Sequence, residues 1–162
     1  MNLKNPGELV ARMELGTPER ILLVDVPDEL VRLFEGARGN RRTTLSTGGE
    51  AIRALKHPFD AVLVWREHRG GSRAVFDGAL KRLESGAPLW IVTALKKVRG
   101  PSTPAVHRLE LPDLVKAFEK EGLAHDREVR VSAWHVAHRF ARKMNNEPGS
   151  GGITPRRGRT SP

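Results

Sequence analysis

The stretch GAPLWIVTALKK, residues 86–97, decides the fold that this sequence predicts. At its centre, residues 89–92 form a short apolar run rich in aromatic and β-branched side chains, with Gly-Ala-Pro before it and a basic segment after it. Such a run is typical of a strand that is buried on both faces. Two earlier runs, residues 21–26 and 61–65, have the same character, and a segment of helix length separates each run from the next. We therefore expect a parallel sheet with helices on both faces.

The segments between and beyond these runs complete an alternating pattern of strands and helices. The pattern predicts a weaker strand at residues 41–46, helices at residues 29–35, 50–56, 73–84 and 111–121, and two short antiparallel strands within residues 128–143. Gly122 is expected to end the last helix in a left-handed conformation. The fold class is therefore a three-layer, Rossmann-like α/β domain, whose mostly parallel sheet closes with two antiparallel strands at its C-terminal end.

The chain of 162 residues is the size of one domain with one hydrophobic core. Residues 1–16 are expected to form a short lead-in with a helical turn or two from Glu8 to Glu14, and with a frayed start because Asn-Pro-Gly stands close to the N-terminus. Residues 17–143 are expected to form the α/β domain. Residues 144–162 have too few apolar side chains to pack, and we expect them to form a disordered basic tail.

The sequence lacks two features, cysteine and a long apolar run, and each absence excludes some classes of function. The sequence has no cysteine, which excludes disulfides, thiolate metal sites and a cysteine nucleophile, and which fits a reducing compartment. It also has no apolar run of about 18 residues, and its start lacks the apolar centre of a signal peptide. We therefore expect a cytoplasmic protein with no membrane partner.

The net charge of +9 is the strongest positive signal in the composition. Such an excess of positive charge raises affinity for nucleic acid or another polyanion, because binding releases counterions from the phosphate backbone. The charge is unevenly distributed, since residues 137–162 hold six Lys and Arg side chains against one Glu. The alternative is that these charges are solvated and serve only solubility.

Five motifs carry a resemblance to a known fold family. They are ERILLVDVP at residues 19–27, FDAVLV at residues 59–64, LESGAPLWIVTALKK at residues 83–97, Gly122-Leu123, and Trp134 followed by Arg139-Phe140. Together they resemble a pared-down class I methyltransferase sheet, and more closely a family of short uncharacterised bacterial proteins known only as a domain of unknown function. In that family a Leu-Trp strand, a lysine loop, a helix ending in Gly-Leu and a closing Trp to Arg-Phe strand recur. The resemblance covers about residues 17–143 and implies a methyltransferase-like fold, and it brings no known activity with it.

The turn after the first strand argues against a cofactor. In doubly wound sheets, ligands bind beyond the carboxyl ends of the strands, and a glycine-rich turn lets backbone N–H groups approach them. Here the turn is Asp-Val-Pro-Asp-Glu, residues 25–29, in which Pro27 lacks a donor and three carboxylates repel phosphate. The second strand, ending Leu-Ser-Thr-Gly-Gly, offers no acid for a ribose hydroxyl unless Glu50 reaches back. We therefore predict no cofactor site, and interpret the carboxylates as charges that favour a helix N-terminus.

A second resemblance is to a response-regulator receiver domain. ILLVD at residues 21–25 and FDAVLV at residues 59–64 are similar to receiver strands. The receiver's phospho-acceptor aspartate would stand at the end of the third strand, where this chain has Trp65. Phosphoryl transfer at that position is therefore excluded, and a pseudo-receiver that binds other proteins remains as an alternative.

Histidine and tryptophan residues give weak signals. His135 and His138 are three residues apart, which places them on opposite faces of a strand, so we do not expect a shared metal ion. We interpret them as surface or half-buried residues. Trp65, Trp90 and Trp134 are interpreted as core or strand-end packing rather than platforms for nucleic-acid bases.

The sequence therefore predicts a small basic binding or adaptor protein that is not catalytic, with nucleic acid as its ligand. The predicted phosphate-binding residues are Lys96, Lys97, Arg99, Arg139, Arg142, Lys143, Arg156, Arg157 and Arg159. Contacts of this kind hold the phosphate backbone without reading base sequence. Two alternatives stay open: a methyltransferase dependent on S-adenosylmethionine with an atypical cofactor loop, and a module that binds an unidentified protein partner. No catalytic or metal-binding residue is predicted.

Overall fold

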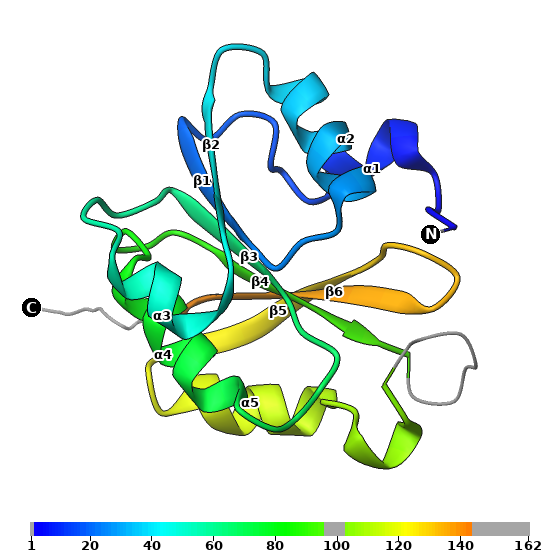
Figure 1. Cartoon of the computed structure of the whole chain (residues 1–162), viewed down its shortest axis with the longest axis vertical. Helices are drawn as coiled ribbons and strands as arrows, with labels where there is room; N and C mark the ends of the chain where they lie inside the picture. The colour runs from blue at the N-terminus through cyan, green and yellow to red at the C-terminus, as the bar shows by residue number, and fades with distance from the viewer. Residues whose placement is uncertain (1, 96–102, 144–162) are drawn as a thin grey trace, which may run out of the picture.

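Six strands form one mixed sheet in the computed structural model, which describes residues 2–95 and 103–143 (Figure 1). The strands are β1 (Arg20–Val24), β2 (Arg42–Ser46), β3 (Ala61–Trp65), β4 (Leu89–Ala94), β5 (Leu123–Arg130) and β6 (His135–Arg142). Their order across the sheet is β2-β1-β3-β4-β6-β5. The first four strands are parallel, and β6 is antiparallel to both β4 and β5.

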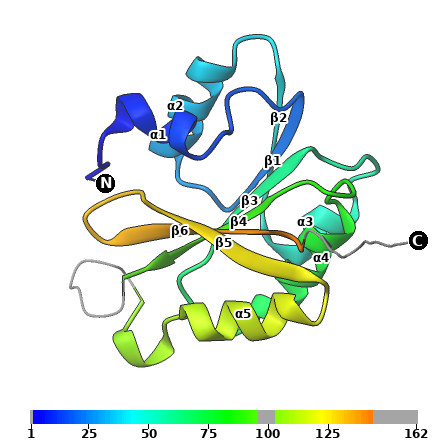
Figure 2. The same cartoon turned by 180° about the vertical axis from the view of Figure 1, so that it is seen from behind.

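Five helices cover the two faces of this sheet, and a short 3-10 turn at Ala105–His107 follows β4. The helices are α1 (Pro6–Arg12), α2 (Asp28–Arg38), α3 (Gly48–Arg53), α4 (Ser72–Lys81) and α5 (Leu111–Glu119). Helices α1 and α2 lie on one face, and α3, α4 and α5 lie on the other, as Figures 1 and 2 show from opposite sides. The predicted fold class, a three-layer and mostly parallel α/β domain closed by two antiparallel strands, is confirmed.

Strand β4 has both faces buried, as its apolar sequence predicts. All six of its residues are buried, and Trp90 has no exposed surface. Trp90 and Val92 belong to the core cluster on the side of α1 and α2, whereas Leu89 and Ile91 belong to the cluster on the side of α4 and α5. Alternate residues of one strand thus supply two cores, which leaves functional chemistry to the strand ends and to the antiparallel hairpin.

The lead-in at residues 1–16 contains a helix, α1, which overlaps the helical turns expected from Glu8 to Glu14, but its start is not frayed as predicted. Pro6 starts α1 at a position where its missing N–H costs no hydrogen bond, so the Asn-Pro-Gly segment initiates a helix. Leu9, Met13 and Leu15 are fully or almost fully buried in the same core cluster as Trp90. The first residues therefore pack as part of the α/β domain.

Two other element boundaries also differ from the sequence prediction. Helix α2 continues past Gly36 and ends at Gly39, which has the left-handed φ of 61°. Strand β5 begins at Leu123, directly after Gly122, and is eight residues long, whereas only residues from 128 onward were predicted as strand. The segment His-Asp-Arg-Glu lacks strand-like alternation because β5 is an edge strand that carries a bulge. Gly122 adopts the predicted left-handed conformation, with φ 83°.

Some predictions fall outside the described residues. The basic tail at residues 144–162 and the lysine loop at residues 96–102 belong to this group. Across residues 2–95 and 103–143, no helix is both long enough and apolar enough to cross a membrane.

Arg38 links three segments at one end of the sheet. Its side chain is fully buried, and its guanidinium donates hydrogen bonds to the carbonyl oxygen of Leu15 at 2.7 Å, the hydroxyl of Thr43 at 2.8 Å and the carbonyl oxygen of Arg42 at 2.8 Å. Burial lowers the pKa of Arg38, and nearby Arg41 lowers it further. The last turn of α2 is thereby attached both to β2 and to the loop before β1.

Substitution of Arg38 by Leu should lower the free energy of unfolding by about 3 kcal/mol, because several buried carbonyl groups lose their donors. Urea denaturation followed by circular dichroism measures this change. The control is Arg32→Leu on the exposed side of the same helix, which should change stability by less than about 0.5 kcal/mol. Equal denaturation midpoints for the two variants would contradict this role of Arg38.

Candidate functional site

The carboxyl ends of the parallel strands meet at one edge of the sheet. Two adjoining hollows lie there, one of about 370 Å³ beside the ends of β1 and β2, and one of about 220 Å³ beside the end of β3. Asp25, the residue after β1, lines both. This is the edge at which doubly wound sheets bind their ligands.

The larger hollow combines carboxylates, hydroxyls and apolar surface. Asp25 and Asp28 supply the carboxylates, and Ser46 and Thr47 supply the hydroxyls. Leu45 also lines it and is 56% exposed, which is unusual for a large apolar side chain. The Ser46 hydroxyl oxygen is buried and has no hydrogen-bond partner among the described residues. A buried, unpartnered hydroxyl beside an open apolar surface is a polar group that a ligand can satisfy.

Asp25 replaces glycine at a position where glycine is favoured. Its φ is 56°, in the left-handed region, which aspartate tolerates better than most residues with side chains. Its backbone N–H donates to the carbonyl oxygen of Ser46 at 2.9 Å, and its carboxylate accepts from the N–H of Gly48 at 3.2 Å. The turn after β1 therefore holds the turn after β2, and Asp25 is fixed beside the hollow despite the lack of glycines.

The smaller hollow leads to a chain of hydrogen-bonded side chains. Glu67 lines it, and its carboxylate lies 2.7 Å from Nε2 of His135, while Nδ1 of His135 lies 2.9 Å from the Ser132 hydroxyl. A carboxylate only accepts, so Nε2 carries the proton, and in the neutral imidazole Nδ1 accepts from Ser132. The ring of Trp65 lies 4.4 Å from that of His135. This arrangement can accept and hold a proton at Glu67 or His135.

The sequence pattern did not identify this group of hydrogen-bonded side chains. Glu67 follows β3, whereas Ser132 and His135 flank the turn into β6, so 68 residues separate the carboxylate from the imidazole. Only the pairing of β4 with both β3 and β6 brings them together. The apolar runs of β3 and β4 predict the two strands, but they do not indicate which polar residues meet at the strand ends.

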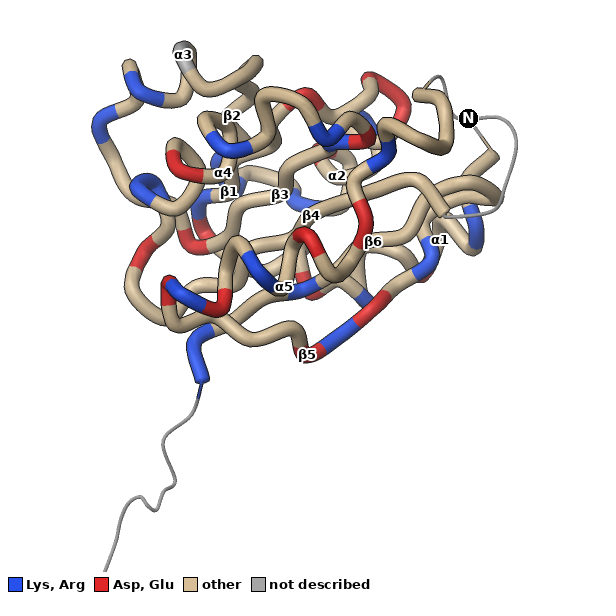
Figure 3. Tube along the Cα trace, turned by 90° about the horizontal axis from the view of Figure 1, so that it is seen from below, with Lys and Arg blue, Asp and Glu red and all other residues tan. Residues whose placement is uncertain are grey.

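Of the predicted phosphate-binding residues, the structure describes Arg139 and Arg142 in β6 and Lys143 directly after it. Lys96, Lys97, Arg99, Arg156, Arg157 and Arg159 lie outside the described residues. Arg139 is paired with Asp126. Because β6 is antiparallel to β4, Arg142 at its end lies at the edge opposite the two hollows. Figure 3 shows acidic and basic residues interspersed along the trace, including neighbours of opposite charge on β5.

His135 and His138 lie on opposite faces of β6, as expected, but the prediction that they are surface or half-buried residues is wrong. They are 4% and 3% exposed, because both faces of β6 are covered. Burial lowers the pKa of His138 to about 4, although the nearby carboxylate of Glu128 acts in the opposite direction. His138 is therefore neutral near pH 7.

Comparison with known proteins identifies the fold. No family model matches the chain, and no curated protein matches it. A SAM dependent methyltransferase from Aquifex aeolicus superposes with a TM-score of 0.60 and 15% identity, over 84% of this chain and 88% of that one. The N-methyltransferase NodS from Bradyrhizobium japonicum WM9 superposes with a TM-score of 0.51 and 15% identity, over 87% and 99%.

A larger enzyme contains the same fold as part of a longer chain. The mitomycin 7-O-methyltransferase MmcR superposes with a TM-score of 0.62 and 11% identity, over 85% of this chain and 53% of that one. The chain thus spans about half the length of this neighbour. At such identities the likeness shows the fold alone, and it confirms the methyltransferase-like fold that the sequence motifs implied.

Protonation of His138 should make stability depend on pH. The unfolded chain binds a proton near pH 6.5, whereas folded His138 does so only near pH 4, so stability should fall as pH decreases through this window. Between pH 7 and 4.5 the contribution of His138 is about 2–3 kcal/mol. Urea denaturation of wild type and His138→Gln in EDTA buffer measures it, and the variant should lose less stability on acidification. A decline of the same size in both proteins would contradict the assignment.

Proposed function

We propose that this chain binds S-adenosylmethionine at the carboxyl edge of its sheet and acts as a methyltransferase. The observation that carries the proposal is the buried, unpartnered hydroxyl of Ser46, in a hollow that also presents two carboxylates and the exposed apolar surface of Leu45. This differs from the sequence-based expectation of no cofactor. That expectation assumed a ligand with phosphate, which the carboxylates would repel, whereas the proposed ligand carries a positive charge.

The carboxylates of this edge suit a cation. Asp25 and Asp28 disfavour a phosphate, as the sequence predicts, but S-adenosylmethionine has no phosphate and carries a positive sulfonium. Carboxylates attract such a charge through space, even where they do not contact it. Because Asp25 lines both hollows, it lies where the adenosine-binding hollow would join the hollow that contains Glu67.

In this proposal, one group of residues binds the cofactor and another removes a proton from the molecule that accepts the methyl group. Leu45 would cover the adenine, Ser46 would bond to a polar atom of the nucleoside, and Asp25 would face the sulfonium. When bound, S-adenosylmethionine supplies an electrophilic methyl group. Glu67, oriented by His135, would take the proton that a hydroxyl or amine acceptor loses. Support for this division comes from the fold, which the chain has in common with solved methyltransferases.

Nucleic-acid binding is a second candidate, and the net charge of +9 favours it. In this alternative the chain is a non-catalytic adaptor that holds phosphates with the basic residues predicted from the sequence. Among the described members of that set, Arg142 and Lys143 stand at the end of β6 and after it, away from the acidic edge. A polyanion would therefore bind at a different surface from the cofactor.

S-adenosylmethionine should bind the full chain more tightly than its demethylated product S-adenosylhomocysteine, which lacks the sulfonium charge. Asp25→Asn should weaken binding of S-adenosylmethionine about 3- to 10-fold and that of the product less, because asparagine keeps the left-handed backbone but removes the charge. Isothermal titration calorimetry measures both constants. Asp77→Asn, on the outer side of α4, is the matched control. No binding of either compound at millimolar concentration would refute the proposal.

Binding to duplex DNA, if it occurs, should fall steeply between about 50 and 200 mM salt, because released counterions drive it. Arg142→Glu should weaken binding to all sequences alike and lower the slope against log salt by about one. Fluorescence anisotropy with a labelled duplex measures both quantities, and Arg32→Glu on α2 is the control. Undetectable binding at about 50 mM salt, or binding that is insensitive to salt, would remove this candidate.

A further inference from the structure

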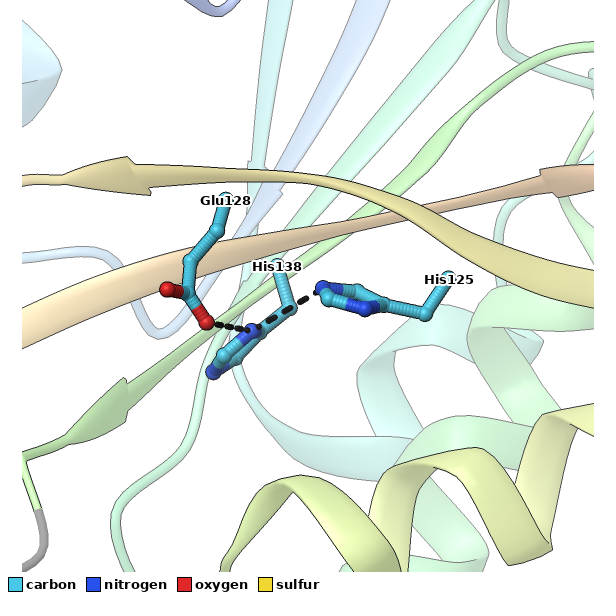
Figure 4. A group of neighbouring side chains, drawn as sticks. All are labelled: His125, Glu128 and His138. Carbon is cyan, nitrogen blue, oxygen red and sulfur yellow. Dashed lines mark hydrogen bonds and ion pairs between the residues drawn. The ribbon is translucent and has the colours of Figure 1, made fainter.

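The β5–β6 hairpin brings together three side chains that ligate metals in many proteins. They are His125 and Glu128 from β5 and His138 from β6, on the face of the sheet that also packs against α5 (Figure 4). One nitrogen or oxygen from each lies within 4.8 Å of the others. Within this group, Nδ1 of His138 is 3.3 Å from Nε2 of His125 and 3.3 Å from a carboxylate oxygen of Glu128.

A β-bulge creates this arrangement. In a regular strand, residues three apart point to opposite faces, so His125 and Glu128 would lie on different sides of the sheet. The pairing of β5 with β6 shifts between His125 and Arg127, with the extra residue Asp126 inserted. As a result Glu128 stands opposite His138, and His125 points to the same face. Bulges commonly re-aim side chains in this way, and they occur often beside functional sites.

The distances match those between ligands of one metal ion. Bonds of about 2.0–2.1 Å at tetrahedral angles place two zinc ligands about 3.3 Å apart. Both contacts of Nδ1 of His138 have this length. In Figure 4 the three side chains point toward one another from two strands, so a single ion between them would need little rearrangement.

Hydrogen bonding can serve only one of the two contacts of His138 Nδ1 at a time. Nδ1 of a neutral imidazole has either one proton or one lone pair in the plane of its ring. With a proton, it faces two acceptors, the lone pair of His125 and the carboxylate of Glu128. Without a proton, Nδ1 can accept a hydrogen bond from Nε2–H of His125, but its lone pair then lies beside the negatively charged carboxylate of Glu128. A metal ion accepts a lone pair from all three groups at once.

We propose that His125, Glu128 and His138 bind one divalent transition-metal ion of the zinc class, with water in the remaining position. Imidazole nitrogens favour zinc over magnesium or calcium, which prefer oxygen ligands. Glu128 is 56% exposed at its side chain, which gives the ion a path from solvent. His138 also lines a cavity of about 220 Å³ near the end of β4, which provides room for the water. Three protein ligands and a water are the pattern of zinc sites with an open position.

This proposal is independent of the proposed cofactor site. The ion would connect the edge strand β5 to β6 on the face covered by α5, whereas Glu67 contacts His135 from the opposite face of β6. Loss of zinc binding and loss of S-adenosylmethionine binding are therefore separate outcomes, measured with different probes.

The test uses the full chain after removal of metal by EDTA and dialysis. Titration with Zn²⁺ in competition with a chromophoric chelator should give one equivalent bound with a Kd of about 1 µM or below. Zinc at about 100 times its Kd should raise Tm by about 5–10 °C. Co²⁺ should give the intense visible absorption of a four-coordinate site with nitrogen ligands.

Two variants and one control make the assignment specific. His125→Ala and Glu128→Gln should each weaken zinc binding at least about 10- to 100-fold and abolish the zinc-dependent rise in Tm. Their metal-free Tm values should stay close to that of wild type, since neither residue is fully buried, and this would show that the fold is intact. His57→Ala removes an exposed histidine elsewhere and should bind zinc like wild type. Wild-type binding weaker than about 100 µM, or variants that bind zinc as tightly as wild type, would overturn the proposal.

Discussion

The burial of the central parallel strands β1, β3 and β4 on both faces is the constraint on which the rest of the structure depends. Strand β4 has no exposed residue, and its alternate side chains belong to two separate cores. Polar groups inside such a sheet would lose hydration without gaining partners. Functional side chains are therefore restricted to the ends of the parallel strands and to the β5–β6 hairpin. Asp25, Ser46 and Glu67 occupy the first of these places, and His125 with His138 occupies the second.

The chemistry of the carboxyl edge follows from the turn after β1, which is built without glycine. Asp25 adopts a left-handed conformation and accepts a hydrogen bond from Gly48, so the same residue forms the turn and supplies a negative charge. A glycine there would leave the edge open to phosphates, whereas a carboxylate selects against them. The carboxylates of this turn would therefore favour a cationic ligand over an anionic one at the proposed site. The turn does not close the edge to ligands, because the hollow beside Ser46 remains.

The fold was more predictable from the sequence than the site. Strands β1, β3 and β4 follow from continuous apolar runs, and the left-handed Gly122 follows from its place after a helix, because both signals are local. The helical turns of α1 were expected, but its start at Pro6 and its packing in the core were missed, because Asn-Pro-Gly is also typical of a loop. The start of β5 was missed because a half-exposed, bulged edge strand lacks regular alternation. The contact between Glu67 and His135 and the position of His125 depend on strand order and register, which no local pattern contains.

Strand β6 connects the two sites, because its side chains alternate between the faces of the sheet. His135 points to one face and bonds to Glu67, while His138 points to the other and meets the residues of the bulge. The bulge interrupts the ladder between β5 and β6 opposite Arg139 and Phe140, so the hairpin has fewer regular hydrogen bonds next to His138. An ion held by both strands would compensate for this interruption by fixing the register of β6. The same register places His135 opposite Ala94 at the end of β4, and so decides whether the imidazole reaches Glu67.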